Sequence, residues 1–192
     1  DYDMAGFAVG VAKKNKIING SGIKEGDRLV GLRSSGVHSN GYSLVRKLFP
    51  PVKEDLERFD AELGESPAQA LLRPTRIYVK TILSLIEKHP IKGIAHITGG
   101  GFIENIPRIL PEGLAAKIDR SSYEIPALFK ALQRRSGISD EKMYNTFNMG
   151  LGMVLAVDPA DVDKTMDAIR EAGDQPYVVG KIEAGEKGVT LC

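Results

Sequence analysis

The sequence predicts an α/β (α+β) fold in which a mixed β-sheet is covered by helices. Three observations favour this fold. Short apolar segments typical of strands alternate with segments of helical periodicity, glycine is concentrated in the connections between them, and no internal repeat or low-complexity tract breaks the order. A chain of 192 residues is also long enough to bury a substantial core.

Segments rich in β-branched, aliphatic and aromatic residues predict the strands, because such side chains suit the half-buried surface of a sheet. They fall at residues 4–11, 28–32, 91–98, 113–118, 148–157, 177–183 and 189–191. The last two are expected to form a terminal hairpin that turns through Gly185.

Apolar residues three and four positions apart predict the helices. These are expected at residues 42–49, 75–89, 106–110, 126–135 and 159–172. The residues predicted to cap their amino ends are Thr75, Asn105 and Asp158. The residues predicted to end helices are Pro50, Pro90 and Gly173. The charged residues 52–66 lack a clear period and predict a surface connection with at most a short helix.

The charge balance argues against partners that are bound by electrostatic attraction. Lysine and arginine number 26 against 25 acidic residues, so neither nucleic acid nor an anionic membrane is an expected partner. Cys192 is the only cysteine, which excludes a disulfide framework and fits a reducing cytoplasm. No pair or triplet of histidines and carboxylates has metal-ligand spacing, so no metal ligands are predicted.

The first candidate site is the serine loop, defined as Ser34–Gly41, between a predicted strand and helix. Free backbone N–H groups at a helix start, with hydroxyl and amide donors, suit a phosphate group. The residues expected to contact phosphate are Ser34, Ser35, Gly36, Ser39, Asn40 and Gly41. His38 can titrate near neutral pH and is the candidate catalytic residue. An alternative fits the local pattern equally well: Ser39 caps the helix and Asn40-Gly41 is a plain turn.

The second candidate is the glycine loop, defined as His96–Gly101, which also follows a predicted strand. Successive glycines leave backbone amides free to form an anion-binding nest. The expected binding residues are His96, Thr98, Gly99, Gly100 and Gly101, with Asn105 and Arg108 downstream. The alternative is a glycine hinge with Asn105 as a plain cap and Arg108 in solvent. Residues 143–153 are expected mostly as strand, with Asn148 facing a cleft.

Five blocks of the sequence resemble the phosphoribosylformylglycinamidine cyclo-ligase (AIR synthetase) family in order and spacing. They are Asp1–Phe7, Ser34–Leu44, Arg73–Lys80, His96–Pro107 and Tyr144–Met153. The resemblance implies that residues 1–192 are the single carboxy-terminal domain of an AIR synthetase-like protein, with residues 1–12 as the end of the interdomain connection. It also implies that the amino-terminal ATP-binding domain is absent from this sequence.

The resemblance implies ATP-dependent ring closure of formylglycinamidine ribonucleotide to aminoimidazole ribonucleotide, in de novo purine biosynthesis. ATP and Mg²⁺ would be bound mainly by the amino-terminal domain, in a cytoplasmic enzyme that is a homodimer at full length. This chain would supply part of the active-site cleft and be inactive alone. The alternatives are another ATP-dependent enzyme of the superfamily, such as a kinase of a small phosphate ester, or a non-catalytic phosphate-binding or oligomerising module.

Overall fold

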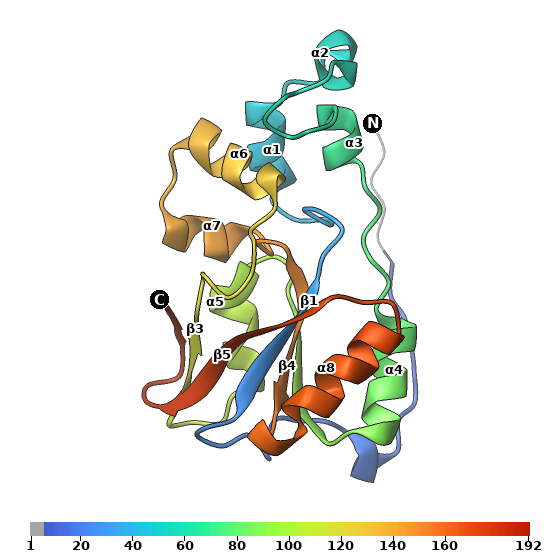
Figure 1. The fold of residues 1–192 in the computed structure, drawn as a ribbon, viewed down its shortest axis with the longest axis vertical. Helices are drawn as coiled ribbons and strands as arrows, with labels where there is room; N and C mark the ends of the chain where they lie inside the picture. Colours follow the sequence, from blue (N-terminus) through green and yellow to red (C-terminus); the bar gives the residue numbers. More distant parts are fainter. Residues whose placement is uncertain (1–5) are drawn as a thin grey trace.

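The computed structural model describes residues 6–192 and contains a six-stranded mixed sheet (Figure 1). Its strands are β1 (Arg28–Arg33), β2 (Ile91–His96), β3 (Leu114–Ile118), β4 (Leu151–Val157), β5 (Pro176–Ala184) and β6 (Val189–Leu191). Their order across the sheet is β2-β4-β1-β5-β3-β6. All neighbouring pairs are antiparallel except β3 and β6, which are parallel. The predicted mixed sheet is confirmed.

Helices cover both faces of this sheet. They are α1 (Tyr42–Leu48), α2 (Lys53–Glu57), α3 (Pro67–Leu71), α4 (Val79–Lys88), α5 (Gly101–Asn105), α6 (Ala127–Ser136), α7 (Asp140–Thr146) and α8 (Val162–Glu171). Side chains of β4 alternate between two cores, because successive residues of a strand point to opposite faces. Leu155 and Val157 pack in the core that α4 and α8 cover, and Val154 and Ala156 pack in the core with α5, α6 and α7. Figure 1 shows α4 and α8 side by side on their face.

Several predicted helix boundaries are confirmed because local side chains set them. The Asp158 carboxylate accepts a hydrogen bond from the backbone N–H of Ala160, and Pro159 begins the 3-10 turn that leads into α8. Gly173 follows α8 with a left-handed φ of 82°. In α6, the apolar side of the helix is buried as the periodicity predicts.

Two predicted strand features are wrong. Residues 4 and 5 lie outside the described residues, and residues 6–11 form no strand but expose Phe7, Val9 and Val11. The terminal hairpin is wrong because β5 and β6 lie on opposite sides of β3 rather than beside each other. After β5 the chain crosses the start of β3, where the backbone N–H of Gly185 donates to the carbonyl of Gly113.

The predicted helix over 75–89 begins later, at Val79. Thr75 does not cap it, because the Thr75 hydroxyl lies 3.2 Å from the Ser39 hydroxyl in a hydrogen bond. The helices α3 and α7 are not among the predicted helices, although the sequence contains the serines that cap them. Ser66 forms a capping box at the start of α3, and the Ser139 hydroxyl accepts the N–H of Lys142 in α7.

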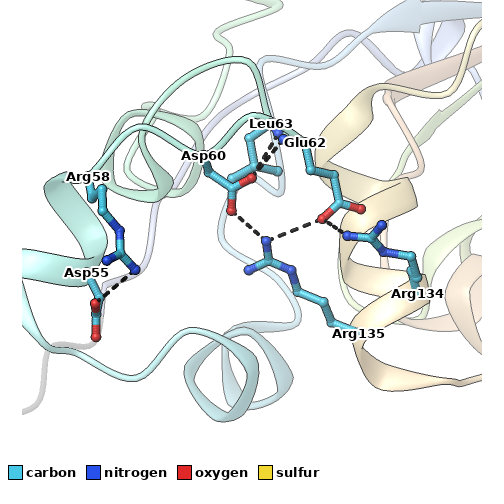
Figure 2. A network of polar contacts seen from close by, with 7 residues as sticks. All are labelled: Asp55, Arg58, Asp60, Glu62, Leu63, Arg134 and Arg135. Atoms are coloured by element: carbon cyan, nitrogen blue, oxygen red, sulfur yellow. Dashed lines mark hydrogen bonds and ion pairs between the residues drawn. The ribbon is translucent and has the colours of Figure 1, made fainter.

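Residues 52–66 form the predicted surface connection with one short helix, and ion pairs hold this connection to α6. The Arg135 guanidinium lies 2.5 Å from Asp60 Oδ2 and 3.3 Å from Glu62 Oε2, and Arg134 also pairs with Glu62 (Figure 2). The hydrogen bond from Arg135 is the main reason that the pKa of Asp60 lies below its usual value. Arg135 also stacks over the Phe49 ring at 4.4 Å, which fixes the connection beside the end of α1.

A buried charge cluster ties the opposite end of the sheet together. Lys92 Nζ lies 2.6 Å from Asp27 Oδ1 and 3.1 Å from Asp158 Oδ2. Asp27 is completely buried, and its second oxygen accepts the backbone N–H of Lys24 at 2.9 Å. The cluster therefore joins the chain just before β1 to β2 and to the segment that leads into α8.

We expect Lys92→Ala to lower the free energy of unfolding by about 3 kcal/mol, because it leaves the Asp27 carboxylate buried without its cation. Chemical denaturation of the wild type and the variant measures this loss. The control is Lys187→Ala, whose partner Glu112 is largely exposed, and which should cost less than about 1 kcal/mol. Equal losses in the two variants would contradict the prediction.

Candidate functional site

The serine loop and the glycine loop lie close together in the structure. They follow β1 and β2. Because both strands pair antiparallel with β4, they run in the same direction, and their carboxyl ends lie at the same end of the sheet. Ligands of open α/β sheets collect at such strand ends. A methyl group added at Gly99 would lie 3.5 Å from Asn40 Oδ1, which places the two loops in near contact.

Both loops pack against one stretch of chain, the 144–152 segment, which joins the end of α7 to the start of β4. A Cβ atom at Gly101 would lie 1.9 Å from the Tyr144 carbonyl oxygen, and one at Gly41 would lie 2.2 Å from the Phe147 ring. Both glycines also have left-handed φ angles, of 53° and 75°. Only glycine satisfies the close approach and the backbone angle together, so these glycines bring the loops against the segment.

The side chain of Asn148 binds the serine loop from within this segment. Its Nδ2 donates to the Gly36 carbonyl at 2.8 Å, and its Oδ1 accepts from Ser34 Oγ at 3.0 Å and from the Gly150 N–H at 2.9 Å. Asn148 is only 1% exposed. The expectation that it faces a cleft is therefore wrong, because its amide is used entirely inside the protein.

His38 is buried in the serine loop and has a left-handed φ of 56°. Its Nε2 accepts a hydrogen bond from the Ser35 N–H at 3.2 Å and a longer one from the Arg76 N–H at 3.5 Å. Burial, and then the nearby His96 and Arg76, lower the pKa of His38 to about 4. The ring is therefore neutral at pH 7 and carries its proton on Nδ1, an atom with no partner among the described residues. Because the neutral ring accepts the N–H groups of Ser35 and Arg76, it orients the backbone at these two residues.

The glycine loop is organised by Asn105 rather than capped by it. Nδ2 of Asn105 donates to the carbonyls of Gly99 at 3.1 Å and Gly101 at 2.7 Å. The prediction of an N-cap is wrong, because this amide folds back on the loop and the helix begins five residues earlier than expected, after Gly100. In the described part of the chain, the backbone N–H groups of Gly99 and Gly100 have no acceptor, so they are available to a ligand.

Arg108 adds a positive charge beside the glycine loop. It lies in the 3-10 turn Pro107–Ile109, and its Nη1 donates to Asn105 Oδ1 at 3.0 Å. The side chain stays 63% exposed, with Glu104 3.9 Å away. The anchor on Asn105 and the ion pair with Glu104 therefore keep the guanidinium next to the loop, with much of the side chain exposed.

His96 lies at the end of β2 and lines a cavity of about 360 Å³ with side chains that include Arg76, Tyr78 and Met153. The Tyr78 ring lies between two histidines, with its centre 6.3 Å from that of His96 and 6.2 Å from that of His38. Its hydroxyl donates to the Arg33 carbonyl at 2.8 Å, and burial raises the pKa of this phenol.

Several residues that shape the site are not among the predicted site residues. The periodicity predicts that Arg76 and Tyr78 lie in a helix, but both precede α4 and lie beside His38. The available signal was Gly152, where a Cβ atom would lie 2.2 Å from the Tyr78 hydroxyl and 2.7 Å from His38 Cε1. A glycine inside a strand often marks such a close approach.

Residues 6–192 contain no group of three or more histidine, cysteine, aspartate or glutamate side chains placed to hold a metal ion. Within the same range, every helix is too short or too polar to cross a membrane.

Residues 24–192 match the family described as AIR synthase related protein, C-terminal domain. The chain is 56% identical over 193 residues to phosphoribosylformylglycinamidine cyclo-ligase of Lachnospira eligens, covering 100% of this chain and 57% of that protein. It is 50% identical over 192 residues to the protein of the same name from Acetivibrio thermocellus, covering 100% of this chain and 56% of that protein. The chain thus spans about half the length of the curated relatives it matches.

Solved structures share the fold at low sequence identity. Thiamine-monophosphate kinase from Stenotrophomonas maltophilia has a TM-score of 0.64 at 14% identity, covering 94% of this chain and 54% of that chain. E. coli HypE, a hydrogenase maturation protein, has a TM-score of 0.56 at 17% identity, covering 90% and 47%. T. maritima PurL complexed with AMPPCP has a TM-score of 0.51 at 11% identity, covering 90% and 24%. The expected superfamily fold is confirmed.

The buried His38 ring should make the chain less stable in acid. An unfolded chain protonates this ring near pH 6.5, but the folded chain does so only near pH 4. Between these values the unfolded state binds more protons, so the free energy of unfolding falls as pH decreases. The loss amounts to at most about 3 kcal/mol.

The variant His38→Asn isolates this contribution, because asparagine tolerates the left-handed backbone and does not titrate. Urea denaturation at several pH values between 4 and 6.5 should show a shallower pH dependence for the variant than for the wild type. Identical pH dependences would mean that His38 is not the group responsible.

Proposed function

This chain belongs to the family of the AIR synthase related protein, C-terminal domain, and we propose that it supplies one side of the active site of a phosphoribosylformylglycinamidine cyclo-ligase. The observation that carries the proposal is the close approach of the serine loop and the glycine loop at the carboxyl ends of β1 and β2. Relatives of this name at 50–56% identity, each longer than this chain, support the same function.

The proposed reaction closes the imidazole ring of formylglycinamidine ribonucleotide at the expense of ATP. The formyl oxygen attacks the γ-phosphorus, and ADP leaves. An amidine nitrogen then attacks the former formyl carbon, the carbon–oxygen bond breaks with release of phosphate, and loss of a proton gives aminoimidazole ribonucleotide. Both steps place negative charge on phosphoryl oxygens, so the protein's main task is to position and stabilise anions.

The described residues suit that task. The N–H groups of Gly99 and Gly100, the Asn40 amide and the Arg108 guanidinium are the donors that we propose for phosphate groups. For His38 we propose a positioning role, because a neutral ring whose Nε2 already accepts backbone N–H groups is poorly suited to carry protons at pH 7.

The remaining parts of the site would lie outside the described residues. The use of ATP is supported by the shared fold of T. maritima PurL, whose structures are complexes with AMPPCP, ADP and FGAR. We also propose that Mg²⁺ is held mainly by the rest of a longer polypeptide, and that the full-length enzyme is a cytoplasmic homodimer. This chain alone is then expected to be inactive, and ATP-dependent product formation by it would contradict that expectation.

We expect Arg108→Ala in the full-length enzyme to lower kcat/KM for formylglycinamidine ribonucleotide by about tenfold or more, since a charged phosphate contact is lost. Steady-state kinetics with ATP measures this change. Arg170→Ala is the matched control, because Arg170 is exposed on α8 and pairs only locally with Asp167. An unchanged kcat/KM in Arg108→Ala, or an equal loss in the control, would rule out the proposed contact.

A further inference from the structure

The turn after α7 holds an asparagine, Asn148, whose side-chain oxygen and nitrogen both form hydrogen bonds inside the protein. Asn148 Oδ1 accepts the Gly150 N–H at 2.9 Å, and the Leu151 N–H donates back to the Asn148 carbonyl at 2.9 Å. Between them, Met149 adopts a left-handed φ of 48°, an angle that costs a non-glycine residue on the order of 1 kcal/mol. The side-chain bond to Gly150 therefore helps to hold a turn that the sequence would otherwise disfavour.

The same side chain reaches across to the start of the serine loop. Its Nδ2 donates to the Gly36 carbonyl, and its Oδ1 accepts from Ser34 Oγ. The Ser34 N–H donates to the Gly150 carbonyl at 2.8 Å, so backbone and side chain bind the loop together. These groups are buried, and in a buried environment a lost partner leaves an unsatisfied polar group that costs more than the bond itself.

The far side of the serine loop is held less firmly. Ser35 Oγ donates to the Pro74 carbonyl, and the hydroxyls of Ser39 and Thr75 share a hydrogen bond, but both contacts are exposed. Water competes for exposed hydrogen bonds, so they contribute little to holding a conformation. Besides the buried His38 ring and the packing of Gly41 against Phe147, the bonds of Asn148 to Ser34 and Gly36 are therefore the loop's buried polar anchor.

We propose that Asn148 is the positioning residue that pre-orders the serine loop for its ligand. The inference rests on the proposed function, because it assumes that this loop binds a phosphate group. A loop fixed before binding loses less conformational entropy when the ligand arrives, so affinity and rate are both gained. Asn148 itself, buried beneath the loop, acts through Ser34 and Gly36 rather than by touching substrate.

The test uses Asn148→Ala in the full-length enzyme, with two controls. Asn145→Ala removes an exposed asparagine from α7, the helix that precedes the turn. Ile169→Ala creates a cavity in the core beneath α8, on the opposite face of the sheet, and so matches the loss of stability without touching the loop. Steady-state kinetics, the melting temperature and amide hydrogen exchange of residues 34–41 are measured for each.

Asn148→Ala should raise the exchange rate of residues 34–41 and lower kcat/KM by about tenfold or more. Ser34→Ala should also lower kcat/KM, by a smaller factor. The double variant should lower kcat/KM by less than the product of the two single-variant factors. Ile169→Ala should lower the melting temperature while leaving kcat and KM unchanged. Unchanged exchange of residues 34–41 in Asn148→Ala, or an equal kinetic loss in Ile169→Ala, would overturn the inference.

The two proposals fail in different ways. If the wild-type enzyme does not convert formylglycinamidine ribonucleotide with ATP, the proposed function is wrong. Hydrogen exchange still tests the inference in that case, because it needs no turnover. If the wild type is active and Asn148→Ala retains the wild-type kcat/KM, the inference is wrong and the proposed function stands.

Discussion

The close packing of two glycines against the 144–152 segment is the constraint on which the candidate site depends. Gly101 meets the backbone at Tyr144, and Gly41 meets the Phe147 ring, so neither position has room for a side chain. The segment thereby holds loops that follow β1 and β2, and β4, which begins within it, lies between those strands. One short stretch of chain sets the distance between two sets of anion donors.

Electrostatics follows from this packing. His38 lies against Gly152 of the segment, and Arg76 and His96 approach it from two other elements. Burial and the neighbours His96 and Arg76 keep the ring neutral. Its Nε2 therefore carries no proton and can accept the Ser35 N–H. The loop therefore owes its shape to an uncharged histidine at its centre and a buried asparagine at its base.

Much of the fold could be predicted because local patterns determine it. Apolar periodicity indicated the buried face of α6, and Asp158 with Pro159 indicated the start of the last helix. The errors arose where distant residues decide the outcome. Thr75 bonds to Ser39 instead of capping α4, and β6 pairs with β3 across a connection that sequence spacing cannot show. For the site, residue types predicted both loops, but the roles of Asn105 and Asn148 depend on which carbonyls they reach in the folded chain.

If the proposed function is correct, the two loops act as one binding site. Amide hydrogen exchange of the full-length enzyme, titrated with formylglycinamidine ribonucleotide and a non-hydrolysable ATP analogue, tests it directly. We expect peptides spanning residues 34–41 and 96–105 to become protected over the same range of ligand concentration. Protection of one loop while the other exchanges as in the free enzyme would contradict a shared site.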